Sequence, residues 1–514
     1  MDIDKSLIDN SEDSEEKTNE VKKAFDEMAD AYKKCEEFEK SVVFPKNFIL
    51  NEKEEDNEKS LLKQLKNSID KWEKKLSDLR NSSIDLFSIS SSMNNFITQI
   101  CSIKDHPIKK REEPFKVKYL KGLGTCLNKF KDNKKQIESL YKAWYLSIIE
   151  CEPHDACLKG FDLKDISRAL RIQRKGFRFF TMQKEFFFDC FYLLSVVAPH
   201  RCDELYEWLH KEFCSIFTRP LLKKVYTFFK DGINEDIIPK ELLEHKNQCD
   251  KYQAKSVKNV LVVANVSAGK STLINALVGY RLNKMRTTAS TSRLCYIYNK
   301  PVDDGTLAHN YIRNEFSYTN NIESVTSDTA DRISLKFNST LCNEKVCLID
   351  TPGINNVENS THRKITEDAI KSNIYDTIIY ISNCQYFGTT DERRLLEFLK
   401  KYSKRPIIFV LNQLDRFKQK EDSIGKMLYN YYNDLLQIGF ENPKVIPISA
   451  YPALLFKLPN HSLDEDDLYD KEMFELKFKK EYYNMRLYNS SAKKDTSLLD
   501  CSGITYLEEI ISQI

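Results

Sequence analysis

The sequence contains no long hydrophobic run and no CxxC cysteine pair, although it has 14 cysteines. The longest apolar stretch, Phe186–Ala198, spans about 13 residues and includes Asp189, whereas a membrane-spanning helix needs about 20. The N-terminus also lacks the apolar core of a secretory signal. These absences predict a cytoplasmic protein in a reducing compartment. Any membrane contact would be peripheral, on the inner face of the cell membrane.

Two further absences limit the kind of partner. Cys151, His154 and Cys157 lie close together, but their spacing matches none of the common zinc motifs and no second ligand pair follows. The net charge of +2 does not indicate binding of nucleic acid. The sequence therefore predicts neither a zinc site nor a nucleic-acid partner.

The N-terminal half is predicted to be helical where it is folded. At 514 residues the chain is long enough for roughly two or three folding units. Residues 1–57 are rich in Glu, Asp, Lys and Ser, which predicts a largely mobile charged segment. Residues 58–250 have few glycines and place apolar residues at helical spacing, so we expect an all-α, bundle-like domain. The pattern is clearest at Leu65, Ile69, Trp72, Leu76 and Leu79.

Residues 251–514 show a different pattern, in which short apolar runs rich in β-branched residues alternate with helical segments. Such runs are typical of strands that are buried on both faces of a sheet. Their alternation with helices predicts a doubly wound α/β domain with a mainly parallel sheet. The five runs are Val260–Val263, Val346–Ile349, Thr377–Ile381, Ile407–Leu411 and Val445–Ile448.

The first of these runs leads into a phosphate-binding motif, Ala268-Gly269-Lys270-Ser271-Thr272, and a helical pattern follows it. In this order of strand, loop and helix, the loop amides, the helix N-terminus and the Lys270 ammonium together neutralise a polyphosphate. The Ser271 hydroxyl is the expected magnesium ligand. Ala264 stands where the motif usually has its first glycine, which predicts a slightly altered turn.

A second motif, Asp350-Thr351-Pro352-Gly353, follows the predicted strand Val346–Ile349. In a nucleotide site, Asp350 can hold a magnesium-bound water and the Gly353 amide can contact the γ-phosphate. The same four residues are also common in ordinary turns. Only its position after a strand favours the site.

A third motif, Asn412-Gln413-Leu414-Asp415, points to guanine. The Asp415 carboxylate can accept hydrogen bonds from the guanine N1 and 2-amino groups, which adenine does not offer. Ser449 and Ala450 follow the last predicted strand and would supply backbone contacts to the guanine oxygen. Because ligands of open α/β sheets bind at the carboxyl ends of strands, all these motifs together predict a guanine-nucleotide site.

With these motifs in place, residues from about 257 to 514 resemble the GTPase domain of dynamin-like proteins, particularly the bacterial ones. The resemblance includes Ser267–Leu277, Thr287–Ala289, Phe409–Asp415, Pro447–Leu455 and a helical insertion near Asp464–Tyr483. It implies an enzyme that converts GTP and water to GDP and phosphate. It also implies nucleotide-dependent self-association, with membrane remodelling as a further expectation.

The resemblance also implies roles for individual residues. Thr288 would be the switch threonine that contacts magnesium, and Ser267 would help to hold a charge-compensating monovalent cation or the attacking water. With Lys270, these two are the expected catalytic residues, and the expected magnesium ligands are Ser271, Thr288 and, through water, Asp350. The expected nucleotide-binding residues are Asn265, Ala268, Gly269, Lys270, Ser271, Thr272, Gly353, Asn412, Gln413, Asp415, Ser449 and Ala450.

Two positions depart from the pattern of the family. Val266 stands where eukaryotic dynamins place a polar residue that positions the catalytic water. Gln413 replaces the usual lysine of the guanine motif, so its stem can pack on the base without a charge. A nucleotide-binding scaffold with little turnover therefore stays an alternative.

The order of domains also departs from the family. Dynamin-like proteins usually continue past the GTPase domain into a helical stalk with a membrane-contacting tip, whereas this sequence stops at a closing helical pattern, residues 503–511. Either the N-terminal helices replace the stalk, or a partner chain supplies it, or the sequence is incomplete. The expected partner is a second copy or a second dynamin-like chain. The alternative is a soluble regulatory GTPase whose helical half binds a protein.

One segment of the helical half combines basic and aromatic residues, which suits contact with an anionic membrane or an acidic partner. The alternative is an aromatic bundle core beneath a solvated basic face. The basic residues are Arg168, Arg171, Lys175 and Arg178. The aromatic residues are Phe177, Phe179, Phe180, Phe186, Phe187 and Phe188.

Overall fold

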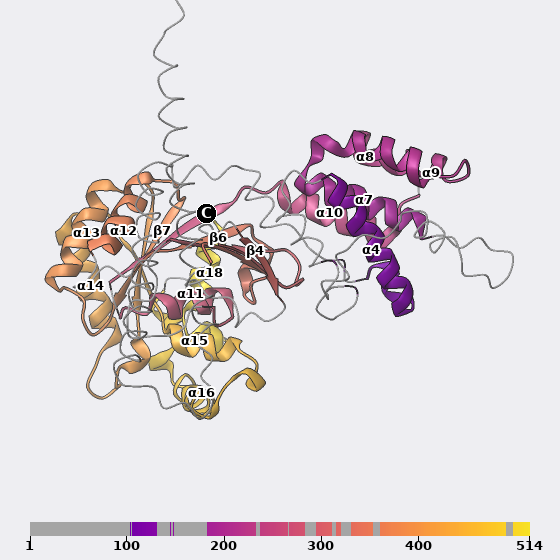
Figure 1. Ribbon diagram of the computed structural model, residues 1–514. Helices are drawn as coiled ribbons and strands as arrows, with labels where there is room; N and C mark the ends of the chain where they lie inside the picture. Colours follow the sequence, from indigo (N-terminus) through magenta and orange to yellow (C-terminus); the bar gives the residue numbers. More distant parts are fainter. Residues whose placement is uncertain are drawn as a thin grey trace, which may run out of the picture. The chain divides into compact units, whose positions relative to one another are not determined.

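The structure is a computed structural model. It describes residues 103, 105–130, 144, 148, 182–232, 237–265, 267–282, 294–310, 315–319, 330–352, 360–489 and 497–514. The predicted mobile segment 1–57, the basic cluster at 168–178, and Val266, Thr288 and Gly353 lie outside these residues. Figure 1 shows that helices precede residue 258 and that an open sheet flanked by helices follows it.

Every regular element in the described part of the chain before residue 258 is a helix. The prediction of a helical N-terminal region is thus confirmed for that part. The α-helices are α4 (Glu113–Lys129), α7 (Gln183–Val197), α8 (Cys202–Trp208), α9 (Arg219–Asp231) and α10 (Lys240–Gln253). Short 3-10 helices cover Pro107–Lys110 and Pro199–Arg201, and a π-helical turn covers Leu209–Phe213.

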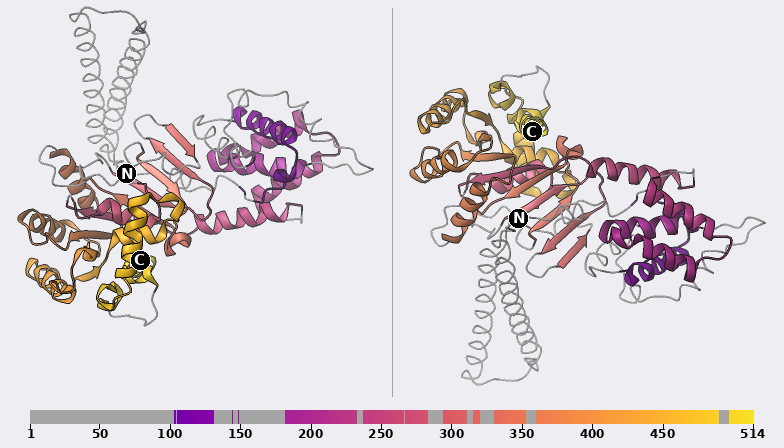
Figure 2. Two further views of the ribbon diagram at one scale, coloured as in Figure 1. Left: turned by 90° about the horizontal axis from the view of Figure 1, so that it is seen from below. Right: turned by 90° about the horizontal axis from the view of Figure 1, so that it is seen from above.

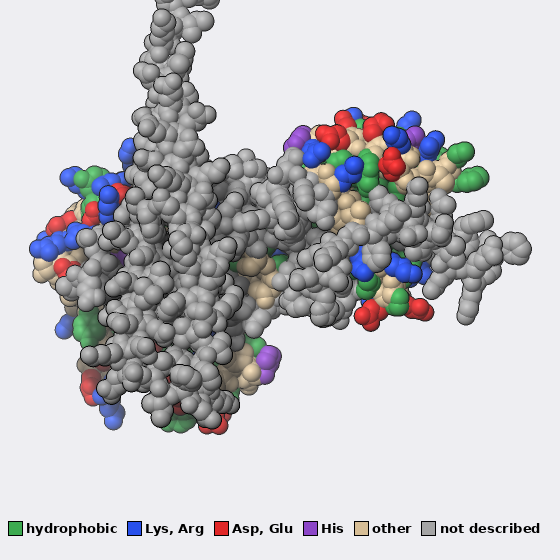
Figure 3. Space-filling view, viewed as in Figure 1, with side chains coloured by type: hydrophobic (Ala, Val, Ile, Leu, Met, Phe, Trp, Pro, Cys, Tyr) green, Lys and Arg blue, Asp and Glu red, His purple; other side chains and the backbone are tan. Residues whose placement is uncertain are grey.

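Aromatic side chains fill the interior of this helical region. Phe186, Phe187 and Phe188 of α7 are all buried; Phe186 stacks on Phe213 with ring centres 5.2 Å apart, and Phe188 stacks on Tyr192 at 5.7 Å. A lipid-facing role for these three phenylalanines is therefore wrong, and the aromatic-core alternative holds for them. The outer side of α8 and α9 shows basic and acidic side chains intermixed (Figure 3).

A buried carboxylate ties several helical elements together. Asp189 is fully buried and accepts hydrogen bonds from the Tyr119 hydroxyl at 2.7 Å, the His106 Nε2 at 3.0 Å and the Trp144 Nε1 at 3.2 Å. The Ile108 amide donates to His106 Nδ1, which places the ring proton on Nε2. Because three donors compensate its charge, Asp189 can stay in an aromatic interior and fix these segments in place.

A second buried histidine makes the stability of this region depend on pH. His245 of α10 lies 3.2 Å from the Tyr192 hydroxyl, and burial lowers its pKa to about 4. The unfolded state, with a normal pKa near 6.5, then binds more protons below that pH. We therefore expect up to about 3 kcal/mol of stability to be lost as the pH falls from about 6.5 to about 4.

Urea unfolding of the parent and of His245→Gln at pH 7 and pH 5 tests this expectation, with tyrosine and tryptophan fluorescence as the signal. The parent should lose more stability than the variant between the two values. Equal losses would show that other groups cause the dependence.

After residue 258 the described chain forms a nine-stranded sheet in the order β4-β3-β5-β2-β6-β1-β7-β8-β9. The five strands β6, β1, β7, β8 and β9 are mutually parallel, which confirms the predicted doubly wound, mainly parallel sheet. The strands are β1 (Lys258–Ala264), β2 (Cys295–Asn299), β3 (Thr306–Asn310), β4 (Glu315–Thr319), β5 (Arg332–Leu335), β6 (Val346–Asp350), β7 (Thr377–Asn383), β8 (Ile407–Asn412) and β9 (Lys444–Pro447). Strands β2 to β5 were not predicted; β3 is antiparallel to its neighbours and β2 is antiparallel to β6.

Helices cover both faces of this sheet (Figures 1 and 2). Because successive side chains of a strand point to opposite faces, Val260 and Val262 join one core with residues of α11, α15 and α18, while Leu261 and Val263 face the other side. On the first face lie α11 (Lys270–Val278), α15 (Ala450–Lys457) and α18 (Ile504–Ser512), and the other face packs against α12 (Ser360–Ser372), α13 (Thr390–Tyr402) and α14 (Ile424–Ile438). Two further helices are α16 (Glu465–Lys477), at the predicted helical insertion, and α17 (Leu498–Cys501).

Candidate nucleotide site

The phosphate loop lies between β1 and α11, at the centre of the sheet. Gly269 precedes α11 and has a left-handed backbone with φ of 89°. A Cβ atom at this position would collide with the side-chain amide of Asn412. Glycine is therefore required both for the backbone conformation and for the close approach of the guanine motif.

Lys270 and Asp350 form an ion pair next to this loop, between the start of α11 and the end of β6. The Lys270 ammonium, 9% exposed, forms an ion pair with the fully buried Asp350 carboxylate. Lys270 is the first residue of α11 and Asp350 is the last residue of β6, the strand next to β1. The sheet thus brings together two motifs that are 80 residues apart in the sequence.

Side-chain amides connect the guanine motif to the phosphate loop. Asn412 Nδ2 donates to the Ala268 carbonyl at 3.0 Å, and its Oδ1 accepts from the Ala450 amide at 3.1 Å. Gln413, at the position of the usual lysine, donates from Nε2 to the Ser267 carbonyl at 3.0 Å. The phosphate loop, the guanine motif and Ala450 are therefore joined by direct hydrogen bonds at the carboxyl ends of the parallel strands.

Asn383, the last residue of β7, belongs to the same network, although it lies in none of the predicted motifs. Its Nδ2 lies 3.3 Å from both the Ser267 carbonyl and the Gln413 Oε1, and its Oδ1 accepts from the Gln385 amide. Ser267 and Gln413 both have positive φ, 66° and 69°, which is unusual for residues other than glycine. The amide contacts hold the two left-handed residues in place. The only sequence signal for Asn383 as a site residue is its position at the carboxyl end of a predicted parallel strand.

Asp415 lies beside this network and is almost completely buried. Burial raises the pKa of its carboxyl, and the positive charges of Lys477 and Arg416 act in the opposite direction. Lys477, the last residue of α16, donates from Nζ to the Asp415 carbonyl. Ser449 and Ala450 are buried at the start of α15, where Ala450 contacts Asn412. The residues predicted to surround a guanine base thus lie together.

The residues present fit a magnesium nucleotide. Ser271 and Thr272 are half-buried in the first turn of α11, next to Lys270. The buried Asn265 Oδ1 at the start of the loop has no hydrogen-bond partner among the described residues, as expected for an amide that faces a polar ligand. The hydroxyl of Ser271 and the carboxylate of Asp350 are hard oxygen groups that suit Mg²⁺. Thr288 and Gly353, the other predicted contacts, lie outside the described residues.

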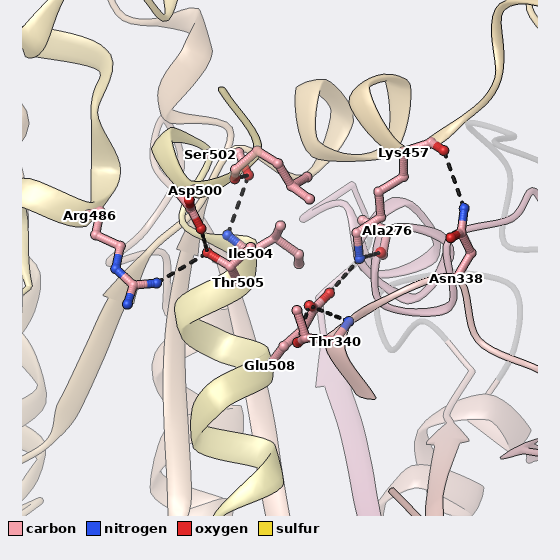
Figure 4. Close-up of polar contacts among 11 residues, drawn as sticks. Ala276, Asn338, Thr340, Lys457, Arg486, Asp500, Ser502, Ile504, Thr505 and Glu508 are labelled. Atoms are coloured by element: carbon pink, nitrogen blue, oxygen red, sulfur yellow. Dashed lines mark hydrogen bonds and ion pairs between the residues drawn. The ribbon is translucent and has the colours of Figure 1, made fainter. Parts of the chain in front are cut away.

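A second polar network holds α11 from the opposite end (Figure 4). The Lys457 ammonium at the end of α15 contacts the Ala276 carbonyl at 2.6 Å and the buried Glu508 carboxylate of α18. Glu508 also accepts a hydrogen bond from the Thr340 hydroxyl at 2.6 Å. The helix that presents Lys270 is therefore anchored by elements from three distant parts of the sequence.

A model of the dynamin family matches residues 260–414, from β1 through the phosphate loop to the start of the guanine motif. This part of the chain is dynamin-like. Among curated proteins, this dynamin-like chain is 22% identical over 253 residues to a probable transmembrane GTPase of Arabidopsis thaliana, FZO-like and chloroplastic. The match covers 49% of this chain but 25% of the relative, so the chain spans about a quarter of that protein's length.

Two solved structures overlap the dynamin-like chain in part. Era of Aquifex aeolicus, bound to GDP and AlF4⁻, is 19% identical, covers 38% of this chain and 52% of its own, and gives a TM-score of 0.25. An oligomerised bacterial dynamin pair, described as sensing and tethering membranes at long range, is 19% identical. The match covers 46% of this chain and 39% of that chain, with a TM-score of 0.29. The family assignment rests on the dynamin-family match. In the described residues no helix combines the length and apolar character needed to cross a bilayer.

Proposed function

We propose that this dynamin-like chain binds GTP with Mg²⁺ and hydrolyses it to GDP and phosphate. The observation that supports this most strongly is that Lys270, Asp350 and Asp415 all lie at the carboxyl ends of the parallel strands, where Asn412 ties the guanine motif to the phosphate loop through the Ala268 carbonyl. Lys270 can neutralise phosphates and Asp350 can help to hold a divalent ion, whereas Asp415 can accept hydrogen bonds from guanine.

The phosphate half of the site would work through charge and fixed backbone donors. Lys270 and the amides of Ala268 to Thr272 would neutralise the phosphates at the N-terminus of α11. Ser271, Thr288 and, through water, Asp350 would hold Mg²⁺, which supplies positive charge to the transferring phosphoryl group. Gly353 would contact the γ-phosphate. Ser267 and Asn265 would face the cleaved bond, where Ser267 would help to hold a monovalent cation or orient the attacking water.

The base half would work through hydrogen bonds in a buried setting. Asp415 would accept from the guanine N1 and 2-amino groups, the Gln413 stem would pack on the base, and Ser449 and Ala450 would contact the guanine oxygen. Since Asp415 is buried, leaving its acceptors unpaired is costly, and this favours guanine over adenine.

Phosphate release from GTP and from ATP, measured on the full chain with Mg²⁺, tests this proposal. Release from GTP alone is expected. Tight GTP binding without release would favour the low-turnover scaffold, the alternative suggested by Ala264, Val266 and Gln413 at motif positions. Equal release from ATP would contradict the guanine assignment.

We also propose that nucleotide promotes self-association, and α16 offers a surface for it. Tyr469, Met473 and Leu476 recur at intervals of four and three residues, so they share one helical face, and they are 70%, 43% and 67% exposed. The same helix contacts the guanine motif through Lys477 and the Asp415 carbonyl. A nucleotide that orders Asp415 would therefore also order this apolar face, against which a second copy could pack.

Leu476→Glu should weaken GTP-dependent self-association at least about tenfold, because it places a charge in the apolar face. Sedimentation velocity with GDP, and with GDP plus aluminium fluoride, measures the change. Tyr429→Glu on α14, where Tyr429 is 66% exposed, is the matched control and should leave association unchanged. If Leu476→Glu associates like the parent, α16 is not the contact.

In the proposed function, the self-associated chains would remodel a membrane, and the helical region would make the peripheral contact with that membrane. The alternative is a soluble regulatory GTPase whose helical half binds a protein. Co-sedimentation with anionic vesicles separates the two, since the soluble GTPase should stay in the supernatant at every salt concentration.

A further inference from the structure

A short turn between the π-helical segment and α9 has an unusually defined backbone. The Thr218 amide donates to the Ser215 carbonyl at 3.0 Å, which closes the turn over residues 215–218. The Ser215 amide donates in return to Thr218 Oγ1 at 2.9 Å, and the Arg219 amide also donates to the Ser215 carbonyl. These bonds on both sides fix Ile216 and Phe217 at the two central positions of the turn.

The residues at these central positions are not the ones that a turn favours. Gly, Pro, Asn, Asp and Ser are common in turns because of their backbone preferences, whereas Ile and Phe offer no such advantage. Ile216 is 78% exposed and Phe217 is 92% exposed, the largest exposed fraction among the large hydrophobic side chains in the described residues. Neither side chain contributes to the aromatic core of the helical region. Folding therefore does not explain the pair.

The surroundings of the 215–218 turn are basic. Residues 211–224 contain four basic side chains and one acidic side chain. Lys211, Arg219 and Lys223 are exposed, and the first turn of α9 contains no acidic residue. Positive side chains at a helix N-terminus oppose the helix dipole, so this arrangement costs some stability and concentrates positive potential at the turn. Figure 3 shows hydrophobic side chains projecting at the end of the segment formed by α8 and α9, with basic side chains close by.

We propose that the 215–218 turn inserts Ile216 and Phe217 into the interface of an anionic lipid bilayer, with Lys211, Arg219 and Lys223 contacting the lipid headgroups. A bilayer presents negative headgroups above an apolar layer, which matches basic side chains beside a projecting apolar pair. A protein partner would need a larger surface, because stable protein interfaces bury about 800 Å² on each side. Two side chains at a turn provide only part of that area. The inference deepens the membrane part of the proposed function and rests on it.

Co-sedimentation of the full chain with phosphatidylcholine vesicles, with and without phosphatidylglycerol, tests the inference. Ile216→Ser/Phe217→Ser should lower binding to vesicles that contain phosphatidylglycerol at least about tenfold, since two large apolar side chains no longer leave water. Arg219→Glu/Lys223→Glu should lower binding to vesicles that contain phosphatidylglycerol and should not change binding to pure phosphatidylcholine vesicles. The control Tyr429→Ser, which removes an exposed aromatic side chain from α14, should bind like the parent. Unchanged binding of the double serine variant would overturn the inference.

A second measurement reports the position of the turn directly. Phe217→Trp adds a tryptophan at the turn. The additional fluorescence of this variant over the parent should be quenched by bromine-labelled lipids. A variant that pellets with vesicles without this quenching would show that another surface binds the lipid. Because Ile216 and Phe217 are exposed and far from the motifs of the nucleotide site in sequence, phosphate release without vesicles should stay at the parent rate in every turn variant.

The outcomes separate the turn from the rest of the proposed function. If the parent releases phosphate from GTP but pellets with neither kind of vesicle, the turn and the membrane role are both wrong while the GTPase stands. If the parent pellets but releases no phosphate, the GTPase proposal fails and the turn stands. If the parent and the double serine variant pellet equally, only the turn is wrong.

Discussion

Lys270→Ala is expected to reduce the affinity of the chain for GTP at least about a hundredfold and to remove measurable phosphate release. The ammonium is the one side-chain cation that the phosphate loop itself contributes, and it lies at the first turn of α11 next to the half-buried Ser271. A charged hydrogen bond to phosphate contributes about 1.5–3 kcal/mol, and one ammonium can contact more than one phosphate oxygen. Isothermal titration with GTP and Mg²⁺ measures the loss.

The Lys270–Asp350 ion pair determines the controls for that experiment. Alanine would leave the buried Asp350 without its partner, and an unpaired buried charge costs about 3–5 kcal/mol of folding stability. Lys270→Gln removes the charge but keeps a side-chain donor for Asp350, so it should lose GTP affinity with a smaller loss of melting temperature than Lys270→Ala. Lys444→Ala changes an exposed lysine at the start of β9 and should leave both quantities unchanged. If folded Lys270→Gln binds GTP like the parent, the phosphate-site assignment is wrong.

Asp415→Asn is expected to exchange the base preference of the site. The carboxylate offers two acceptors to guanine, whereas an amide presents a donor at one of these positions and can pair with the C2 oxygen of xanthine. Because Asp415 is buried, water cannot compensate the mismatch. The affinity for GTP should fall about a hundredfold, and the affinity for xanthosine triphosphate should exceed it.

Competition of the two nucleotides for a fluorescent GTP analogue measures this exchange. Asp466→Asn, on the exposed side of α16, makes the same chemical change outside the site and should keep the preference of the parent. A chain with Asp415→Asn that still prefers GTP would show that another group reads the base.

The parallel part of the sheet could be predicted from the sequence, and the remaining strands could not. Strands such as β1 and β8 are buried on both faces, so they read as continuous apolar runs. In contrast, β3 contains Thr306, His309 and Asn310 among its five residues, and β5 has only four residues. Short strands with polar residues depend on their neighbours for burial, and that information is not local.

A similar distinction applies to the site and to the aromatic segment. Lys270, Asp350, Asn412 and Asp415 belong to short motifs that each follow a predicted parallel strand, so the sequence alone predicts that they lie together. Asn383 is a single amide whose partner Ser267 is 116 residues away, and only the tertiary structure reveals the contact. The phenylalanines of α7 could have faced lipid or the bundle interior, because the two environments select the same side chains.

The hydrogen bonds that Asn412, Gln413 and Asn383 make to the phosphate loop have a consequence for the way the site opens. Each of these amides ends on a backbone carbonyl of Ser267 or Ala268, so the loop cannot rearrange without also releasing the turn that holds Asp415. Segments linked in this way open as one cooperative unit, with a single free energy of opening. The base-reading turn and the phosphate loop, although encoded about 150 residues apart, therefore share one local stability.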